Sequence, residues 1–287
     1  MTNGIVSQDF SAIATVGNFS APWNNTSELF NANHLDSASS ALDNYIKNTT
    51  ELNRLWINAS DISPEFGRLL LLGYVSAVES YVRNILRRLI HEVKVVQERA
   101  HLQMVQYGAV LYHDKSILPE ALLDHTSFAS KDEICGVLQK YLDLKIKEDS
   151  RIKDHIEVFD KICQLRHCCA HRFGKLGAKN ALILGINDHK HILEKPVLLN
   201  LDSLQSIVAW LMSFTKLLNN IIFQKILVDT CNRSSKHHLD WKWSYNKDRV
   251  KYSKLYHLFH TTQDANTSPS IEEMYNRFKS AKQPTGV

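Results

Sequence analysis

The sequence predicts an all-α protein, a helical bundle with a short β-hairpin insertion and a helical C-terminal extension. Glycine and proline are scarce, with 10 and 6 among 287 residues, which argues against many tight turns. Long segments carry apolar residues at the three- and four-residue spacing of amphipathic helices. Helix-capping sequences precede several of these segments, so the apolar spacing and the capping residues predict the same fold class.

The composition divides the chain into three predicted parts. Residues 1–36 are rich in Asn, Ser and Thr, and we expect an N-terminal extension that packs over the core through its scattered aromatic rings. Residues 37–230 carry the periodic apolar segments and form the predicted helical domain. Residues 231–287 form a basic, aromatic C-terminal extension. The aromatic residues of the first part are Phe10, Phe19, Trp23 and Phe30.

Charge is concentrated in the C-terminal extension. From Arg233 to Val287 there are ten Lys or Arg and five Asp or Glu, a surplus of +5. The whole chain carries +4, so the remainder is close to neutral at −1. A net charge this small does not by itself indicate a nucleic-acid-binding protein. The basic segment is therefore a candidate contact for a polyanion or an ordinary solvated face.

The elements are expected in the following order. Ser63-Pro64-Glu65 is typical of a helix start, with serine as the N-cap and proline at the first helical position. Ser130 and Glu133 form a capping box before a further helix. The apolar runs 181–186 and 191–197 flank Asn187-Asp188 and predict the β-hairpin. Helices are expected over 37–58, 63–100, 131–142, 150–172, 202–229 and 271–282.

We expect a cytoplasmic protein with reduced thiols. The five cysteines are an odd number without the spacing of a disulfide framework, and Met1 to Phe10 lacks the pattern of a secretory signal. The most apolar run, 204–228, is interrupted by lysine, asparagine and glutamine residues. It is therefore interpreted as a core helix, and no membrane contact is expected.

The most informative segment is 165–174, near the end of the predicted helix 150–172. Arg166 lies in the helical row of Ile152, Ile156, Phe159 and Cys163, a position that should face the interior. Burying a guanidinium is costly unless it is paired. A carboxylate on another apolar row is available as the partner, because Glu79 lies between Val75 and Val82 in the helix 63–100.

His167 and His171 follow Arg166 and lie one turn apart on one face. Cleavage of a phosphodiester needs a base, an acid and a positive charge at the phosphate, and these three residues supply all of them without a metal or cofactor. Arg166 and His171 are five residues apart, about 140° around a regular helix. They converge only if the helix end loosens or if a homodimer builds the site from two chains.

The pattern of Arg166, His167 and His171 near a helix end resembles the HEPN superfamily (higher eukaryotes and prokaryotes nucleotide-binding). The segment 72–82, with Glu79, is similar to the acid-bearing helix of HEPN domains linked to defence ribonucleases. The resemblance covers roughly residues 37–230. It implies a four- to five-helix domain, usually dimeric, with metal-independent endoribonuclease activity in toxin–antitoxin or antiviral defence systems.

The resemblance also implies roles for the individual residues. Arg166 would contact the scissile phosphate, and His171 would serve as base or acid at the 2′-hydroxyl. His167 would orient the RNA or the second proton, and Glu79 would hold Arg166 or a histidine. The product would carry a 2′,3′-cyclic phosphate, and a toxic nuclease would need an antitoxin or regulatory protein. Apart from the resemblance, which does not cover residues 233–287, the basic and aromatic side chains predict RNA contacts at Arg172, Lys175, Trp241, Lys242, Trp243, Lys247 and Arg249.

Alternative interpretations remain open at this stage. Arg166 and Glu79 would also suit a purely structural ion pair. Cys163, His167 and His171 are spaced as zinc ligands, although no second cluster is visible, and Cys168 or Cys169 beside His171 would suit a thiol nucleophile. The rings of 241–256 would suit base stacking or packing on the bundle. The alternative function is a non-catalytic dimerisation or RNA-binding module that serves a partner protein.

Overall fold

The computed structural model describes residues 13–14, 25–35, 37–114 and 117–283 of a chain that divides into two units, 1–38 and 39–287. In the first unit, the described residues include a 3₁₀ helix, Thr26–Leu29. Phe10, Phe19 and Trp23 lie outside the described residues. Packing of this extension over the core therefore stays a prediction.

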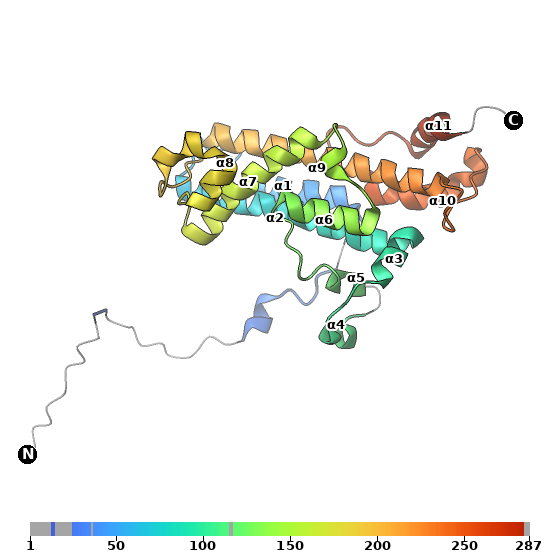
Figure 1. The fold of residues 1–287 in the computed structure, drawn as a ribbon, viewed down its shortest axis with the longest axis horizontal. Coiled ribbons are helices and arrows are strands. Elements are labelled where there is room, and N and C mark those ends of the chain that lie inside the picture. The colour runs from blue at the N-terminus through green and yellow to red at the C-terminus, as the bar shows by residue number, and fades with distance from the viewer. Residues whose placement is uncertain (1–12, 15–24, 36, 115–116, 284–287) are drawn as a thin grey trace, which may run out of the picture. The chain divides into compact units, whose positions relative to one another are not determined.

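The second unit is helical, which confirms the predicted fold class (Figure 1). Its three longest helices, α2, α7 and α9, pack against one another, and α1 and α6 add to the same core. The α-helices are α1 (Ala41–Arg54), α2 (Pro64–Glu92), α3 (Lys94–His101), α4 (Tyr107–Tyr112), α5 (Leu118–Ala121), α6 (Lys131–Leu142), α7 (Lys153–Arg172), α8 (Ala178–His189), α9 (Leu201–Cys231), α10 (Tyr245–Phe259) and α11 (Ile271–Lys282).

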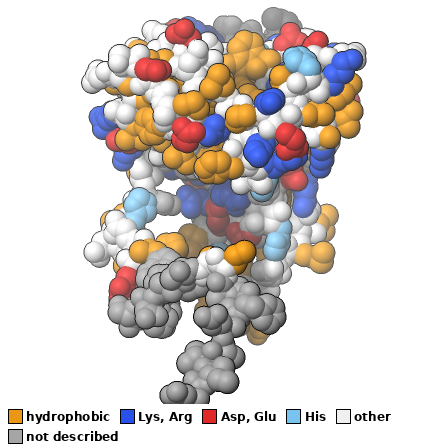
Figure 2. All heavy atoms as spheres, turned by 90° about the vertical axis from the view of Figure 1, so that its left-hand side faces the viewer, with side chains coloured by type: hydrophobic (Ala, Val, Ile, Leu, Met, Phe, Trp, Pro, Cys, Tyr) orange, Lys and Arg blue, Asp and Glu red, His pale blue; other side chains and the backbone are white. Residues whose placement is uncertain are grey.

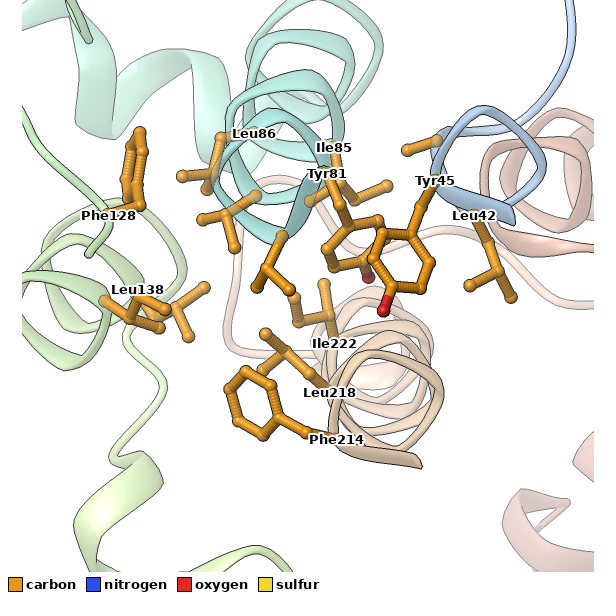
Figure 3. Close-up of a cluster of buried hydrophobic side chains, with 14 of the residues drawn as sticks. Leu42, Tyr45, Tyr81, Ile85, Leu86, Phe128, Leu138, Phe214, Leu218 and Ile222 are labelled. Carbon is orange, nitrogen blue, oxygen red and sulfur yellow. The ribbon is translucent and has the colours of Figure 1, made fainter. Parts of the chain in front are cut away.

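The core lies where α1, α2 and α9 meet. Figure 3 shows side chains of α2, α1 and α9 pointing toward one another, with Phe128 and Leu138 closing the side toward α6. Tyr81 of α2 is fully buried, and its hydroxyl donates to the side-chain oxygen of Asn219 on α9 at 3.2 Å. Burial raises the pKa of Tyr81, so the hydroxyl stays a donor at neutral pH.

Helices α2 and α9 are long and apolar enough to cross a membrane by length and composition alone. Both contribute many side chains to the buried core, as expected of core helices. The exposed positions of α9 are mostly polar. They include Gln205, Ser206, Ser213, Asn220 and Gln224.

The local capping signals are confirmed. The side chain of Ser63 accepts from the Phe66 amide at the start of α2, and Ser130 accepts from the Glu133 amide at the start of α6. Element boundaries are less accurate. Helix α1 is shorter than the predicted 37–58, and the predicted 63–100 helix is broken at Val93, which has an extended backbone.

The predicted β-hairpin is wrong, because residues 178–189 form helix α8. The two runs are both short and apolar, and such a pattern fits a buried helix as well as a strand. Ala181 is buried beside Cys168 and Leu176, so α8 covers the end of α7. Within the described ranges, a single antiparallel bridge between Lys175 and Pro196 is what remains of strand-like pairing here.

The carboxylate of Asp43, on α1, connects the first helix of the second unit to residues 261–263, near the C-terminal part of the chain. It is 3% exposed and accepts hydrogen bonds from the segment that follows α10. The donors are the hydroxyls of Thr261 and Thr262 and the backbone amides of Thr262 and Gln263. Because a buried carboxylate is costly without such donors, this contact ties α1 to the C-terminal part of the chain.

Helix α7 ends in a sharp left-handed turn. Phe173 and Gly174 have φ of 52° and 92°, and the Gly174 amide donates to the Cys168 carbonyl at 2.9 Å, which satisfies a carbonyl of the last helical turn. A Cβ on Gly174 would lie 2.7 Å from Cδ of Arg68, whose side chain is buried against this turn.

Gly174→Ala is therefore expected to lower the free energy of unfolding by about 1–3 kcal/mol, because it combines left-handed strain with a steric clash. Gly136→Ala is the matched control. Gly136 is exposed on α6 with open space around its Cα, so alanine there is expected to add about 0.5–1 kcal/mol. Urea denaturation of the two variants measures both effects, and equal stabilities would contradict the prediction.

Candidate functional site

Arg166 is held by Glu79 across the interface of α7 and α2. Its Nη2 lies 3.5 Å from Oε1 of Glu79, and the two side chains are 26% and 22% exposed. The other carboxylate oxygen of Glu79 accepts from the backbone amide of Phe128 at 3.4 Å. The apolar row that predicted an inward arginine is fully buried from Ile152 to Cys163. Arg166 thus lies at the edge of the core, paired and still accessible to a ligand.

His167 directly follows Arg166, and His171 lies one turn further along α7. The ring centroids of His167 and His171 are 6.1 Å apart, His167 is half-buried and His171 is exposed. Burial lowers the pKa of His167, and the positive charge of Arg166 and the neighbouring His171 lower it further. At neutral pH the His167 imidazole is therefore uncharged and able to accept a proton.

This lowered pKa makes stability depend on pH. The unfolded chain, with an ordinary histidine pKa near 6.5, binds a proton more readily than the folded protein does. The contribution of His167 to stability is therefore complete above that pH and is lost progressively as the pH falls below it. His167→Gln is expected to remove this part of the pH dependence. Urea unfolding at pH 5.5 and 7.5 measures it, with the exposed His191→Gln as control.

Arg166 and His171 do not share a face within one chain. Helix α7 continues through Arg172, and the left-handed turn begins only at Phe173. A loosened helix end, one of the two alternatives that the sequence leaves open, is not seen before Phe173. A site built by two chains stays a prediction.

Arg68 is a site-forming residue that the sequence analysis missed. Its guanidinium donates to the Val197 carbonyl at 3.1 Å, pairs with Glu65 at 2.8 Å and lies over the Phe173 ring. It therefore fixes the turn that follows His171. The signal was available in the sequence, because Arg68 precedes Leu71 and Val75 on an apolar row of α2, as Arg166 follows Cys163 on α7.

The cysteines near the motif are not activated nucleophiles. Burial raises the pKa of Cys163 and Cys168, and it raises the pKa of Cys169 to about 11. A thiol with a raised pKa stays protonated and weakly nucleophilic at neutral pH. No group of three or more His, Cys, Asp or Glu suited to a metal ion occurs among the residues that the structure describes.

Two of the residues expected to bind RNA lie beside the motif. Arg172 is exposed and pairs with Glu194 at 2.6 Å. Its guanidinium packs over Gly177, where a Cβ would lie 2.3 Å from Nη1. Lys175 is exposed on the segment between α7 and α8. Both residues therefore place an exposed cationic side chain within four residues of His171 in the sequence.

The other predicted RNA contacts lie at the opposite end of the second unit, with α10 and α11 (Figure 1). The indole of Trp241 is only 6% exposed and packs against Phe278, so its predicted use as a base-stacking surface is wrong. Trp243 is half-buried against the same ring, and Lys242 pairs with Asp240. Packing on the bundle is therefore the interpretation of this aromatic segment that the structure supports. Lys247 and Arg249 are exposed on α10.

The end of the unit that carries His171 has an apolar surface as well as a basic one. Figure 2 views this end and shows hydrophobic side chains interspersed with Lys and Arg. Exposed apolar residues from the starts of α2 and α9 and from the α7–α8 region contribute to it. They are Leu69, Phe173, Leu182, Ile183 and Leu198.

A scan against models of protein families and searches among curated proteins and solved structures gave no match to this chain.

Proposed function

We propose that this protein is a metal-independent endoribonuclease of the HEPN type, which cleaves RNA through attack of a 2′-hydroxyl. The observation that carries the proposal is the accessible Arg166, which pairs with Glu79 and is followed by His167 and His171 before α7 ends at Arg172. An arginine, a neutral imidazole and a solvent-exposed imidazole are the groups that this chemistry needs.

In the proposed mechanism, Arg166 binds the scissile phosphate and stabilises the charge that develops on its oxygens. Glu79 acts as a positioning residue, because it fixes the guanidinium without reaching the reacting atoms. One imidazole removes the proton of the 2′-hydroxyl, and another protonates the 5′-oxygen that leaves. The phosphorus–oxygen bond to the 2′-oxygen forms as the bond to the 5′-oxygen breaks, which gives a 2′,3′-cyclic phosphate and a 5′-hydroxyl.

We propose a homodimer as the catalytic form. Arg166 and His171 of one chain lie on different sides of α7, so a two-fold axis along this helix would place Arg166 of one chain opposite His171 of the other. The exposed apolar side chains at this end of the unit would be covered in such a dimer, which would remove their contact with water.

The test is cleavage of a structured and an unstructured RNA by purified protein with EDTA present. We expect cutting that survives the chelator and yields cyclic phosphate ends, which phosphatase resistance and mass spectrometry would identify. Activity that disappears with EDTA and returns with Zn²⁺ would support a zinc enzyme instead. A protein that cuts neither RNA in either condition would contradict the proposed activity.

A second candidate function is a non-catalytic RNA-binding or dimerisation module that serves a partner protein. The observation favouring it is a group of strongly exposed apolar side chains around α4, which suits a contact with another protein. The same surface also has a use in the first proposal. If the protein is a toxin or antiphage effector in the cytoplasm, as the resemblance suggests, an antitoxin would bind there. The residues are Leu102, Met104, Tyr107 and Tyr112.

A further inference from the structure

Two arginines continue the row of α2 that begins with Glu79. Arg83 and Arg87 follow Glu79 at successive four-residue steps, so the three side chains leave neighbouring turns of one side of the helix. Each step advances about 6 Å along the helix axis. Consecutive phosphates of an extended nucleic-acid strand are separated by a comparable distance.

A single carboxylate bridges the two arginines. Nη1 of Arg83 lies 3.2 Å from Oε1 of Glu120, and Nε of Arg87 lies 3.8 Å from Oε2 of the same residue. The three side chains are 23–31% exposed, so water and a ligand can reach them. Two guanidiniums around one planar anion resemble the arrangement that binds a phosphate group.

The segment that carries Glu120 also contacts the motif. The guanidinium of Arg83 donates to the Thr126 carbonyl at 3.1 Å and lies over the Phe128 ring at 5.3 Å. The amide of Phe128 donates to Glu79, which holds Arg166. The chain from α5 to Phe128 therefore connects the arginine pair directly to the site proposed for cleavage.

We propose that Arg83 and Arg87 form a binding site for an RNA backbone phosphate next to the Arg166–Glu79 pair, and that Glu120 occupies this site until RNA displaces it. This inference rests on RNA being the ligand of the proposed function. It defines a path along α2 on which a strand approaches the scissile position.

Charge favours the exchange. Glu120 offsets part of the positive charge of Arg83 and Arg87 while it is in place. Its removal takes one negative charge away from these guanidiniums and makes the place where phosphates would bind more positive. Ion pairs with this much exposure contribute little to stability, whereas a phosphate that reaches two guanidiniums also releases counterions.

The experiment measures binding of a fluorescent single-stranded RNA by the full chain carrying His171→Ala, which prevents cleavage. We expect Arg83→Gln/Arg87→Gln to weaken binding about tenfold or more and to reduce the slope of log affinity against log salt by about 1–2. Glu120→Gln is expected to tighten binding. The control is Arg54→Gln with Glu51→Gln, an exposed Arg–Glu pair on α1 that is expected to change neither quantity.

The conservative pair Arg83→Lys/Arg87→Lys keeps the charge and loses only the planar guanidinium geometry. It is expected to retain the salt slope of the parent while the Gln pair lowers it, a difference that a merely structural role of the arginines would not predict. Unchanged affinity and slope in the Gln pair, together with unchanged affinity in Glu120→Gln, would overturn the proposal.

The outcomes for this site and for the proposed function are distinguishable. If RNA is cleaved with dependence on Arg166 while the α2 variants bind like the parent, the phosphate site fails and the ribonuclease proposal stands. If the α2 variants change binding as expected but wild-type protein cuts no RNA, the phosphate site stands in a non-catalytic module.

Discussion

Arg166→Ala and His171→Ala are each expected to lower the rate of RNA cleavage by about 10²–10⁴-fold. Loss of a positioned acid or base has an effect of this size, and so does loss of a preorganised positive charge at the phosphate. Single-turnover cleavage of one RNA at saturating enzyme measures the chemical step without interference from weaker binding. If expression of the wild type inhibits cell growth, expression of either variant is expected not to.

The controls for this experiment separate chemistry from folding. His191→Ala and Arg54→Ala change exposed residues far from the motif in sequence and are expected to cleave at the wild-type rate. Arg166→Lys keeps a positive charge beside Glu79 and is expected to retain part of the activity. If His171→Ala cleaves as fast as the wild type, the assigned role of this histidine is wrong, whatever its stability.

Mixing the two inactive variants is expected to restore activity. In a mixed dimer, one of the two composite sites contains both damaged residues, and the other contains the intact Arg166 of one chain and the intact His171 of the other. At equal amounts, half of the dimers are mixed and half of their sites are intact, so recovery of roughly a quarter of wild-type activity is expected.

Subunit exchange must be complete for this comparison, so the two variants are coexpressed with different affinity tags and the mixed dimer is purified through both. Light scattering at micromolar concentration gives the oligomeric state. A doubly tagged dimer with no activity would show that each site uses Arg166 and His171 from a single chain. A monomer of full activity would contradict the composite site altogether.

The sequence predictions were accurate where structure depends on residues close in the sequence, and they failed where it depends on contacts between distant residues. The N-cap at Ser130 and the C-terminal helix 271–282 depend on neighbouring residues, and both are confirmed. The predicted hairpin at 181–197 failed because its apolar runs are decided by packing on Cys168 and Leu176, which periodicity does not encode. Local pattern thus located the helix starts that carry a serine cap, whereas distant contacts decided the whole segment 178–189.

The same distinction applies to the candidate site. Arg166 and its partner Glu79 could be predicted because each is a charged residue in an apolar helical row, and burying a charge without a partner is costly. The sequence could not show that Trp241 packs against Phe278, since a cation-rich aromatic segment has the same composition when it binds RNA and when it covers a core. Nor could it place α10 at the other end of the unit from α7, because that depends on how the long helices pack.

The contact of Asp43 with residues 261–263 has a consequence for the order of events during protein synthesis. Asp43 leaves the ribosome early, while its hydrogen-bond donors are made more than two hundred residues later. Until then its carboxylate has none of these hydrogen-bond donors, so packing α1 against the core would bury an unpaired charge at a cost in free energy. The hydrogen bonds that hold α1 to the C-terminal part of the second unit would therefore form only after residues 261–263 have been synthesised.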